Sequence, residues 1–109
     1  MITALIIDDE AKSRITLRNF LGKYCKNIEI VGEADGVNSG IEQINKLNPE
    51  VIFLDIHMQD GSGFDLLERI TKKNFKIIFV TAYSQYAIKA FKFSAIDYLL
   101  KPYDPEELV

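Results

Sequence analysis

Five short apolar runs, separated by segments of helical periodicity, set the tightest limit on how this chain can fold. They fall at residues 2–7, 28–34, 51–54, 77–80 and 98–100. Continuous apolar runs of this length, rich in branched residues, are typical of strands buried on both faces of a sheet. The run at 28–34 differs because Glu29, Gly32 and Glu33 interrupt it, which predicts a strand at the sheet edge.

The intervening segments repeat their apolar residues at helical spacing. The four stripes are Leu17, Phe20, Leu21 and Tyr24; Val37, Ile41, Ile44 and Leu47; Phe64, Leu67 and Ile70; and Ala87, Ala90, Phe91 and Ser94. Strands that alternate with helices predict parallel strands joined by helical crossovers, with helices on both faces. We therefore expect an α/β fold, a doubly wound five-stranded parallel sheet, in one domain spanning residues 1–109. Residues 57–63, rich in Gly and polar side chains, are expected to form a loop.

The composition narrows the class of protein. With 109 residues, 48% hydrophobic and 27% charged, the chain has the make-up of an ordinary folded domain and not of a disordered tail. A net charge of −3 argues against direct nucleic-acid binding by this domain. Cys25 is the only cysteine, which excludes an internal disulfide and a cysteine-built zinc site and fits a cytoplasmic location. No apolar run approaches the roughly 20 residues that span a bilayer.

The last residues carry the signals that begin a helix. Asp104 is a capping residue, Pro105 suits the first helical position, and Glu106 and Glu107 place acids in the first turn. The sequence ends at Val109, before such a helix could cover the last strands. We therefore expect a truncated fifth helix and a natural protein that continues.

The polar residues that follow these runs carry the functional argument. Asp8 and Asp9 follow the first run, Asp55 the third, Thr81 the fourth and Lys101 the fifth. The carboxyl ends of parallel strands lie along one edge, where open α/β sheets bind ligands. Taken singly, each has an ordinary structural explanation: a helix cap, the first residue of a loop, a local backbone hydrogen bond and a solvated lysine. Their joint placement predicts one site.

The residue types in this site point to phosphoryl chemistry. Three neighbouring carboxylates repel one another unless a cation lies among them, and Mg²⁺ is the divalent ion that accepts few carboxylates together with water and phosphate. Lys101 can bind a phosphoryl oxygen as a point charge, and the Thr81 hydroxyl can donate to another. Asp55, on the central strand, is the natural nucleophile for an acyl phosphate, with the metal and Lys101 offsetting the developing charge.

On these residues the sequence resembles a response-regulator receiver domain over its whole length. The matching motifs are Asp8-Asp9-Glu10, Asp55, Thr81-Ala82 and Lys101-Pro102. The resemblance implies a flavodoxin-like sheet with strand order 2-1-3-4-5, five helices and a cis peptide before Pro102. It also implies a mode of action in which a sensor histidine kinase phosphorylates Asp55, so that the domain catalyses only its own phosphorylation and dephosphorylation.

The resemblance assigns further roles within the site. Asp9, Asp55 and the main-chain carbonyl of His57 would bind Mg²⁺ directly, and Asp8 would bind it through water. Thr81 and Lys101 would bind the phosphoryl oxygens. Thr81 would then move inward on phosphorylation, and Tyr98 would follow it as the switch aromatic.

Residues 79–87 and 98–103 show a narrower resemblance, to receivers attached to LytTR-type DNA-binding domains of the AgrA-like and LytR-like class. That resemblance implies a transcription regulator whose DNA-binding output domain lies downstream and which forms a homodimer on phosphorylation. A stand-alone receiver, or a pseudo-receiver that acts by protein contact alone, remains an alternative. A Mg²⁺-dependent phosphatase is disfavoured because it needs a second acid two residues after the nucleophile, where this chain has His57.

Two features near Asp55 concern the behaviour of the site. Where the family commonly has Met-Pro, this chain has Met58-Gln59, and the loss of proline predicts a looser loop. His57 and Tyr83 are expected to flank opposite sides of the phosphoryl site and to hinder attacking water. We therefore expect slow self-dephosphorylation.

Overall fold

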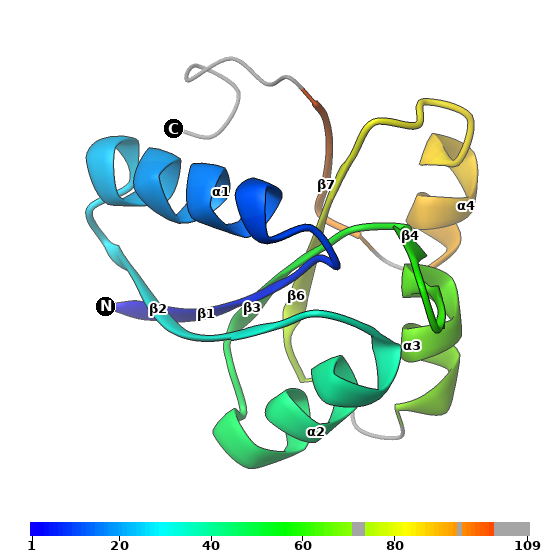
Figure 1. Ribbon diagram of the computed structural model, residues 1–109, viewed down its shortest axis with the longest axis horizontal. Helices are drawn as coiled ribbons and strands as arrows, with labels where there is room; N and C mark the ends of the chain where they lie inside the picture. The colour runs from blue at the N-terminus through cyan, green and yellow to red at the C-terminus, as the bar shows by residue number, and fades with distance from the viewer. Residues whose placement is uncertain (71–73, 94, 102–109) are drawn as a thin grey trace.

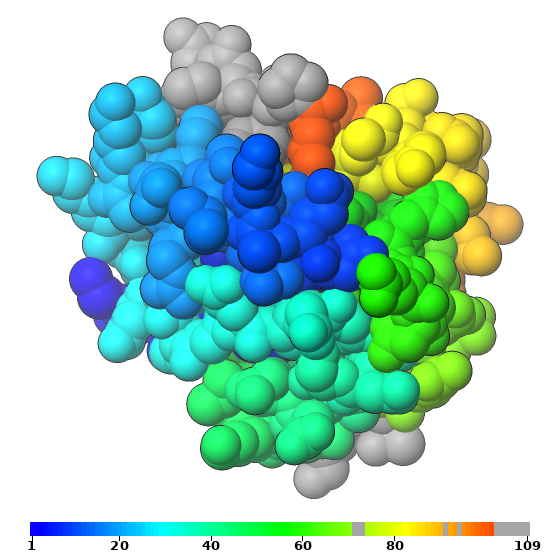
Figure 2. All heavy atoms as spheres, in the orientation of Figure 1, coloured from blue at the N-terminus to red at the C-terminus, as the bar shows by residue number. Residues whose placement is uncertain are grey.

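The computed structural model describes residues 1–70, 74–93 and 95–101. Its elements are β1 (Ile2–Ile7), α1 (Ala11–Tyr24), β2 (Ile28–Ala34), α2 (Val37–Leu47), β3 (Val51–Leu54), β4 (His57–Met58), β5 (Gly61–Ser62), α3 (Gly63–Arg69), β6 (Lys76–Thr81), α4 (Ala87–Lys92) and β7 (Asp97–Leu100). Five of these strands form one twisted sheet, with α1 on one face and α2 and α3 on the other (Figure 1). In the space-filling view, the blue atoms of α1 and the green atoms of α2 lie on either side of the cyan band that includes the edge strand β2 (Figure 2).

The main sheet has the order β2-β1-β3-β6-β7, and every neighbouring pair is parallel. Because β4 and β5 pair only with each other, this order is the predicted 2-1-3-4-5. The interrupted strand β2 lies at the edge, as its polar residues predict. The register places Ile7 beside Leu54, Leu54 beside Phe79, and Thr81 beside Leu100. The carboxyl ends of the strands therefore lie along one edge.

Alternate residues of the strands enter two separate cores, which is why the apolar runs are continuous. Leu5 and Ile7 of β1 face α2 and α3, whereas Ala4 and Ile6 face α1. The buried helical residues facing them are Val37, Ile44, Phe64, Leu66 and Leu67 on the first side, and Leu17 and Leu21 on the second. The Cys25 thiol is buried in the second core, and burial raises its pKa.

The segment after Asp55 is more regular than the expected loop. His57 pairs with Ser62, and Met58 with Gly61, in a two-residue antiparallel ladder. Gly61 adopts a φ of 143°, which glycine alone adopts readily, and this allows the tight reversal. Ser62 and Asp65 then form a capping box at the start of α3. The sequence predicted a loop here and missed these two short paired strands, because composition gives no weight to such local pairs.

Several predictions lie outside the described residues. They concern the peptide before Pro102, the helix expected from Asp104 and the place of Ser94 in the fourth helix. Tyr24, assigned to the buried stripe of α1, is instead exposed. Within the described part of the chain, no helix has the length and apolar character needed to cross a bilayer.

Candidate functional site

Backbone hydrogen bonds between neighbouring strand ends place the polar residues of the site. The N–H of Asp55 donates to the carbonyl of Ile7 at 3.0 Å, and the N–H of Lys101 donates to the carbonyl of Thr81 at 2.8 Å. Asp8, Asp55 and Thr81 are the buried polar residues of the described chain, at 5%, 7% and 0% exposure. These contacts bring the strand-end residues together at one edge of the sheet, as predicted.

The carboxylates form a cluster with the donor set of a hard cation. Asp8, Asp9 and Asp55 each contribute one oxygen, and these oxygens lie within 4.8 Å of one another. A small cluster of carboxylate oxygens fits Mg²⁺, which binds one or two carboxylates and keeps several of its waters in proteins. The residues present therefore fit this ion. The main-chain carbonyl of His57 stays a predicted ligand.

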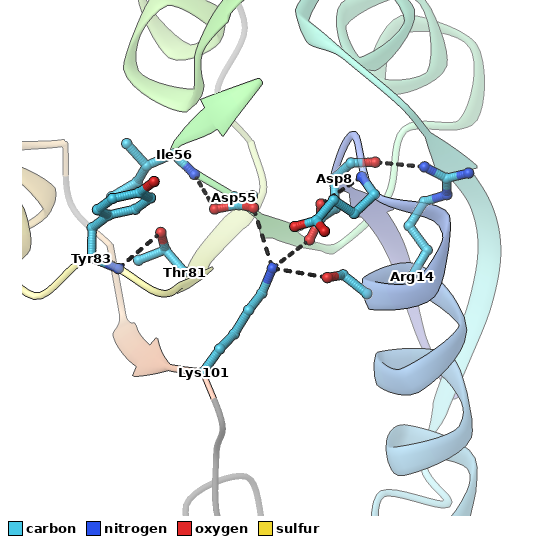
Figure 3. A network of polar contacts seen from close by, with 9 residues as sticks. Asp8, Arg14, Asp55, Ile56, Thr81, Tyr83 and Lys101 are labelled. Atoms are coloured by element: carbon cyan, nitrogen blue, oxygen red, sulfur yellow. Dashed lines mark hydrogen bonds and ion pairs between the residues drawn. The ribbon is translucent and has the colours of Figure 1, made fainter. Parts of the chain in front are cut away.

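Lys101 reaches into this cluster and is not a solvated lysine. Its Nζ lies 2.8 Å from Oδ2 of Asp8, 3.3 Å from Oδ2 of Asp55 and 3.2 Å from Oγ of Ser13 (Figure 3). Burial acts to lower the pKa of Lys101, but the hydrogen bond to Asp8 and the charges of Asp55 and Asp8 outweigh it and raise the pKa. The side chain is therefore a fixed cation within the site.

The surroundings of Asp55 act on its ionisation in both directions. Burial raises the pKa of this carboxyl, the charge of Lys101 lowers it, and the charge of Asp8 raises it again. The Ile56 N–H, which donates to Oδ1 at 2.7 Å, and the Thr81 hydroxyl both lower it. The net result is a raised pKa, because desolvation of a carboxylate favours its neutral form. A cation beside Asp55 would favour the ionised form.

Thr81 and Tyr98 are both connected to Tyr83. The Tyr83 N–H donates to Oγ1 of Thr81 at 3.4 Å, which is the local backbone bond expected of a strand-end threonine. The Tyr98 hydroxyl donates to the carbonyl of Tyr83, and its ring lies against Phe79. Burial raises the pKa of the half-buried Tyr98 phenol, so it stays a donor near neutral pH. One residue of the β6–α4 connection therefore joins the two predicted switch residues.

His57 and Tyr83 meet on the surface beside the site. The sequence predicted that they flank opposite sides, but their ring centroids lie 4.4 Å apart in edge contact. Nε2 of His57 also lies 3.2 Å from the hydroxyl of Tyr86. The placement was wrong because β4 and the β6–α4 connection run close together. Slow self-dephosphorylation stays a prediction.

Three supporting residues escaped the sequence reasoning. Ser13 contacts Lys101 from the first turn of α1, and no local motif in the sequence marks this contact. Asp60 accepts hydrogen bonds from Val37 N–H at 2.7 Å and Asn38 N–H at 3.1 Å, and these bonds lower its pKa. This contact ties the β4–β5 turn to α2, so the missing proline does not leave the turn unanchored. Arg14, the third, contacts the Asp8 carbonyl.

The chain matches a known protein family over nearly its whole length. The family model described as response regulator receiver domain covers residues 4–109. This chain belongs to that family. Curated relatives of the receiver include the sensory transduction protein LytT of Bacillus anthracis, 43% identical over 100% of this chain and 45% of that protein. The transcriptional regulatory protein BtsR of Escherichia coli K12 is 46% identical over 99% of this chain and 45% of that protein.

Solved structures agree with this assignment. The response regulatory domain of protein mrkE from Klebsiella pneumoniae superposes with a TM-score of 0.88 at 28% identity, covering 98% of this chain and 88% of that one. The response regulator TrrA from Thermotoga maritima, in complex with Mg²⁺-BeF, gives a TM-score of 0.85 at 31% identity and covers 99% and 93%. The receiver spans less than half of the curated relatives it matches. The narrower resemblance to LytTR-type receivers agrees with the relatives named LytT.

Proposed function

We propose that this receiver is a Mg²⁺-dependent phosphoacceptor that takes a phosphoryl group from a sensor histidine kinase onto Asp55. The observation that carries the proposal is the arrangement of Lys101 among the carboxylates. Its Nζ contacts Oδ2 of both Asp8 and Asp55, and Asp8, Asp9 and Asp55 each have one carboxylate oxygen within 4.8 Å of the others. This combination offers a cation site, a nucleophile and an oxyanion partner within one cluster of side chains.

The residues divide the transfer between them. An ionised oxygen of Asp55 forms the new bond to phosphorus while the bond from phosphorus to the kinase histidine nitrogen breaks, and its electron pair stays on the imidazole. The ammonium of Lys101 and the hydroxyl of Thr81 donate to the phosphoryl oxygens. Asp9, Asp55 and the carbonyl of His57 would hold Mg²⁺, with Asp8 acting through water. The ion supplies charge neutralisation for the transfer.

The output of the switch is the second part of the proposal. Phosphorylation would draw Thr81 inward, and Tyr98 would follow by leaving its hydrogen bond to the Tyr83 carbonyl. This two-state element would favour a homodimer and so regulate an attached DNA-binding domain of LytTR type, in the cytoplasm. The relative named as a transcriptional regulatory protein supports this output. Apart from its own phosphorylation and dephosphorylation, the domain would catalyse nothing.

Intact mass spectrometry tests the phosphoacceptor role. The receiver is incubated with acetyl phosphate and MgCl₂, and the expected result is a gain of one phosphate. Asp55→Ala should abolish the gain, whereas Asp35→Ala should keep it because this exposed acid lies outside the site. An unchanged mass in the wild type, or an equal gain in Asp55→Ala, would contradict the proposal and favour a pseudo-receiver.

A further inference from the structure

The acid pair is held from behind by an arginine of α1. Nη1 of Arg14 donates to the main-chain carbonyl of Asp8 at 2.7 Å (Figure 3). Asp8 is also held through three other atoms. Its N–H donates to the carbonyl of Ala34 at 3.0 Å, its Oδ1 accepts from Glu10 N–H at 2.9 Å, and its Oδ2 accepts from Lys101. Asp8 is thus locked in place.

The hydrogen bonds to Asp8 also determine where Asp9 lies. The Asp8 carbonyl belongs to the planar peptide that joins the two acids, so its direction sets the backbone of Asp9. Among the residues that the structure describes, none donates a hydrogen bond to the Asp9 carboxylate. The side chain that completes the cation site is therefore positioned through its backbone.

Arg14 is itself held by the edge strand. Nε donates to Oε1 of Glu33 at 3.1 Å, and Glu33 pairs with Ile6 of β1 in the sheet. Oε2 of Glu33 accepts from Nε of Arg18 at 2.6 Å. The Arg14 side chain is 19% exposed and that of Arg18 is 46% exposed. Glu33 therefore binds both arginines, and of these two Arg14 also contacts Asp8 of the site.

We propose that Arg14 is a positioning residue for the cation site, which orients the Asp8–Asp9 peptide and so raises the affinity for Mg²⁺. This inference rests on the proposed function, because it assumes that the carboxylates bind that ion. The geometric and electrostatic effects of Arg14 on the affinity for Mg²⁺ have opposite signs. The positive charge of Arg14 near the site disfavours a second cation, so a purely electrostatic role would make its removal strengthen binding.

Arg18 provides the matched control. Arg14→Ala and Arg18→Ala remove the same charge and the same kind of bond to Glu33, but only Arg14→Ala removes the bond to the Asp8 carbonyl. Arg14→Lys keeps the charge and cannot reproduce the fixed fork that bonds both partners at once. It also serves if Arg14→Ala does not fold.

The experiment is a titration of the receiver with MgCl₂ alone, followed by the NMR amide signals of Glu10 and Ile56, which donate to Asp8 and Asp55. Supporting partners of metal ligands change affinity by on the order of 10-fold or more. We expect Arg14→Ala and Arg14→Lys to raise the Kd about 10-fold, and Arg18→Ala to leave it unchanged or slightly lower.

Two results would overturn the inference alone: a Kd in Arg14→Ala at or below that of the wild type, or an equal rise in Arg18→Ala. Either would leave the proposed function standing. If the wild type bound no Mg²⁺, the proposed function would fall together with the inference.

Discussion

Asp60 caps the N-terminus of α2 in place of the N-cap residue. The N-cap residue of α2 is Gly36, which has no side chain to offer, and the first two N–H groups of α2 donate to the two oxygens of Asp60 instead. Replacing a capping acid by Ala costs roughly 0.5–2 kcal/mol. The bond to Val37 is partly buried, whereas the bond to Asn38 is exposed, so water can replace only the second readily. We therefore expect Asp60→Ala to cost about 1–2 kcal/mol of unfolding free energy.

Thermal unfolding followed by circular dichroism measures this loss. For a domain of this size, such a cost lowers Tm by about 4–8 °C. Asp35→Ala is the control, because Asp35 lies at the same end of α2 with the same charge but binds the Ser39 hydroxyl. We expect a loss of no more than about 0.5 kcal/mol there, as at ordinary surface sites. Equal losses of stability in the two variants would refute the reasoning, because the removal of a negative charge near the start of α2 would then explain the whole effect.

The pH dependence gives a second check on Asp60. Its pKa in the folded protein lies below the ordinary value of 3.8, because the ionised carboxylate accepts the two N–H groups. A lowered folded pKa contributes stability that is present in full above the ordinary value and is lost as the pH falls through the folded value. The difference between wild type and Asp60→Ala should therefore be constant near neutral pH and shrink below about pH 4. A difference that grows on acidification would contradict this sign.

Two further predictions concern the site. Gly63→Ala places a Cβ 2.5 Å from the main-chain oxygen of Asp55, so we expect it to lower the free energy of unfolding by about 1–3 kcal/mol, measured by thermal unfolding. As a control, Gly22→Ala adds a Cβ that meets nothing within 4 Å and should stabilise α1 by up to about 1 kcal/mol. Lys101→Met removes the charge that lowers the pKa of Asp55, so phosphorylation by acetyl phosphate should slow and its pH profile should move to higher pH. An unshifted profile would count against the ammonium's role.

The sequence predicted the sheet and the strand-end residues because both follow from period and position. Strands buried on both faces read as continuous apolar runs, and the residue after each run can lie only at the carboxyl edge. The capping explanation for the acid pair was wrong, since Glu10 is the N-cap of α1 and makes no side-chain cap bond. Asp8 accepts from the N–H of Glu10, outside the helix, and from Lys101, 93 residues away.

The supporting residues could not be predicted in the same way, because their partners are distant in the chain. Asp60 caps a helix that begins 23 residues earlier, and no local motif marks that pairing. Ser13 meets Lys101 across 88 residues. The meeting of Arg14 with Glu33 depends on how α1 packs against the edge strand, which hydrophobic periodicity leaves open.

The ammonium of Lys101 has a consequence for how the domain responds to metal. Three carboxylates and one ammonium leave two negative charges, from −3 + 1, which one divalent ion cancels. Because Lys101 relieves part of the repulsion among these carboxylates, we expect a chelator to leave the domain folded. A structural zinc site behaves in the opposite way, since removing its metal unfolds the domain. If the cluster binds Mg²⁺ as proposed, the receiver would exchange this ion with the surrounding solution without unfolding.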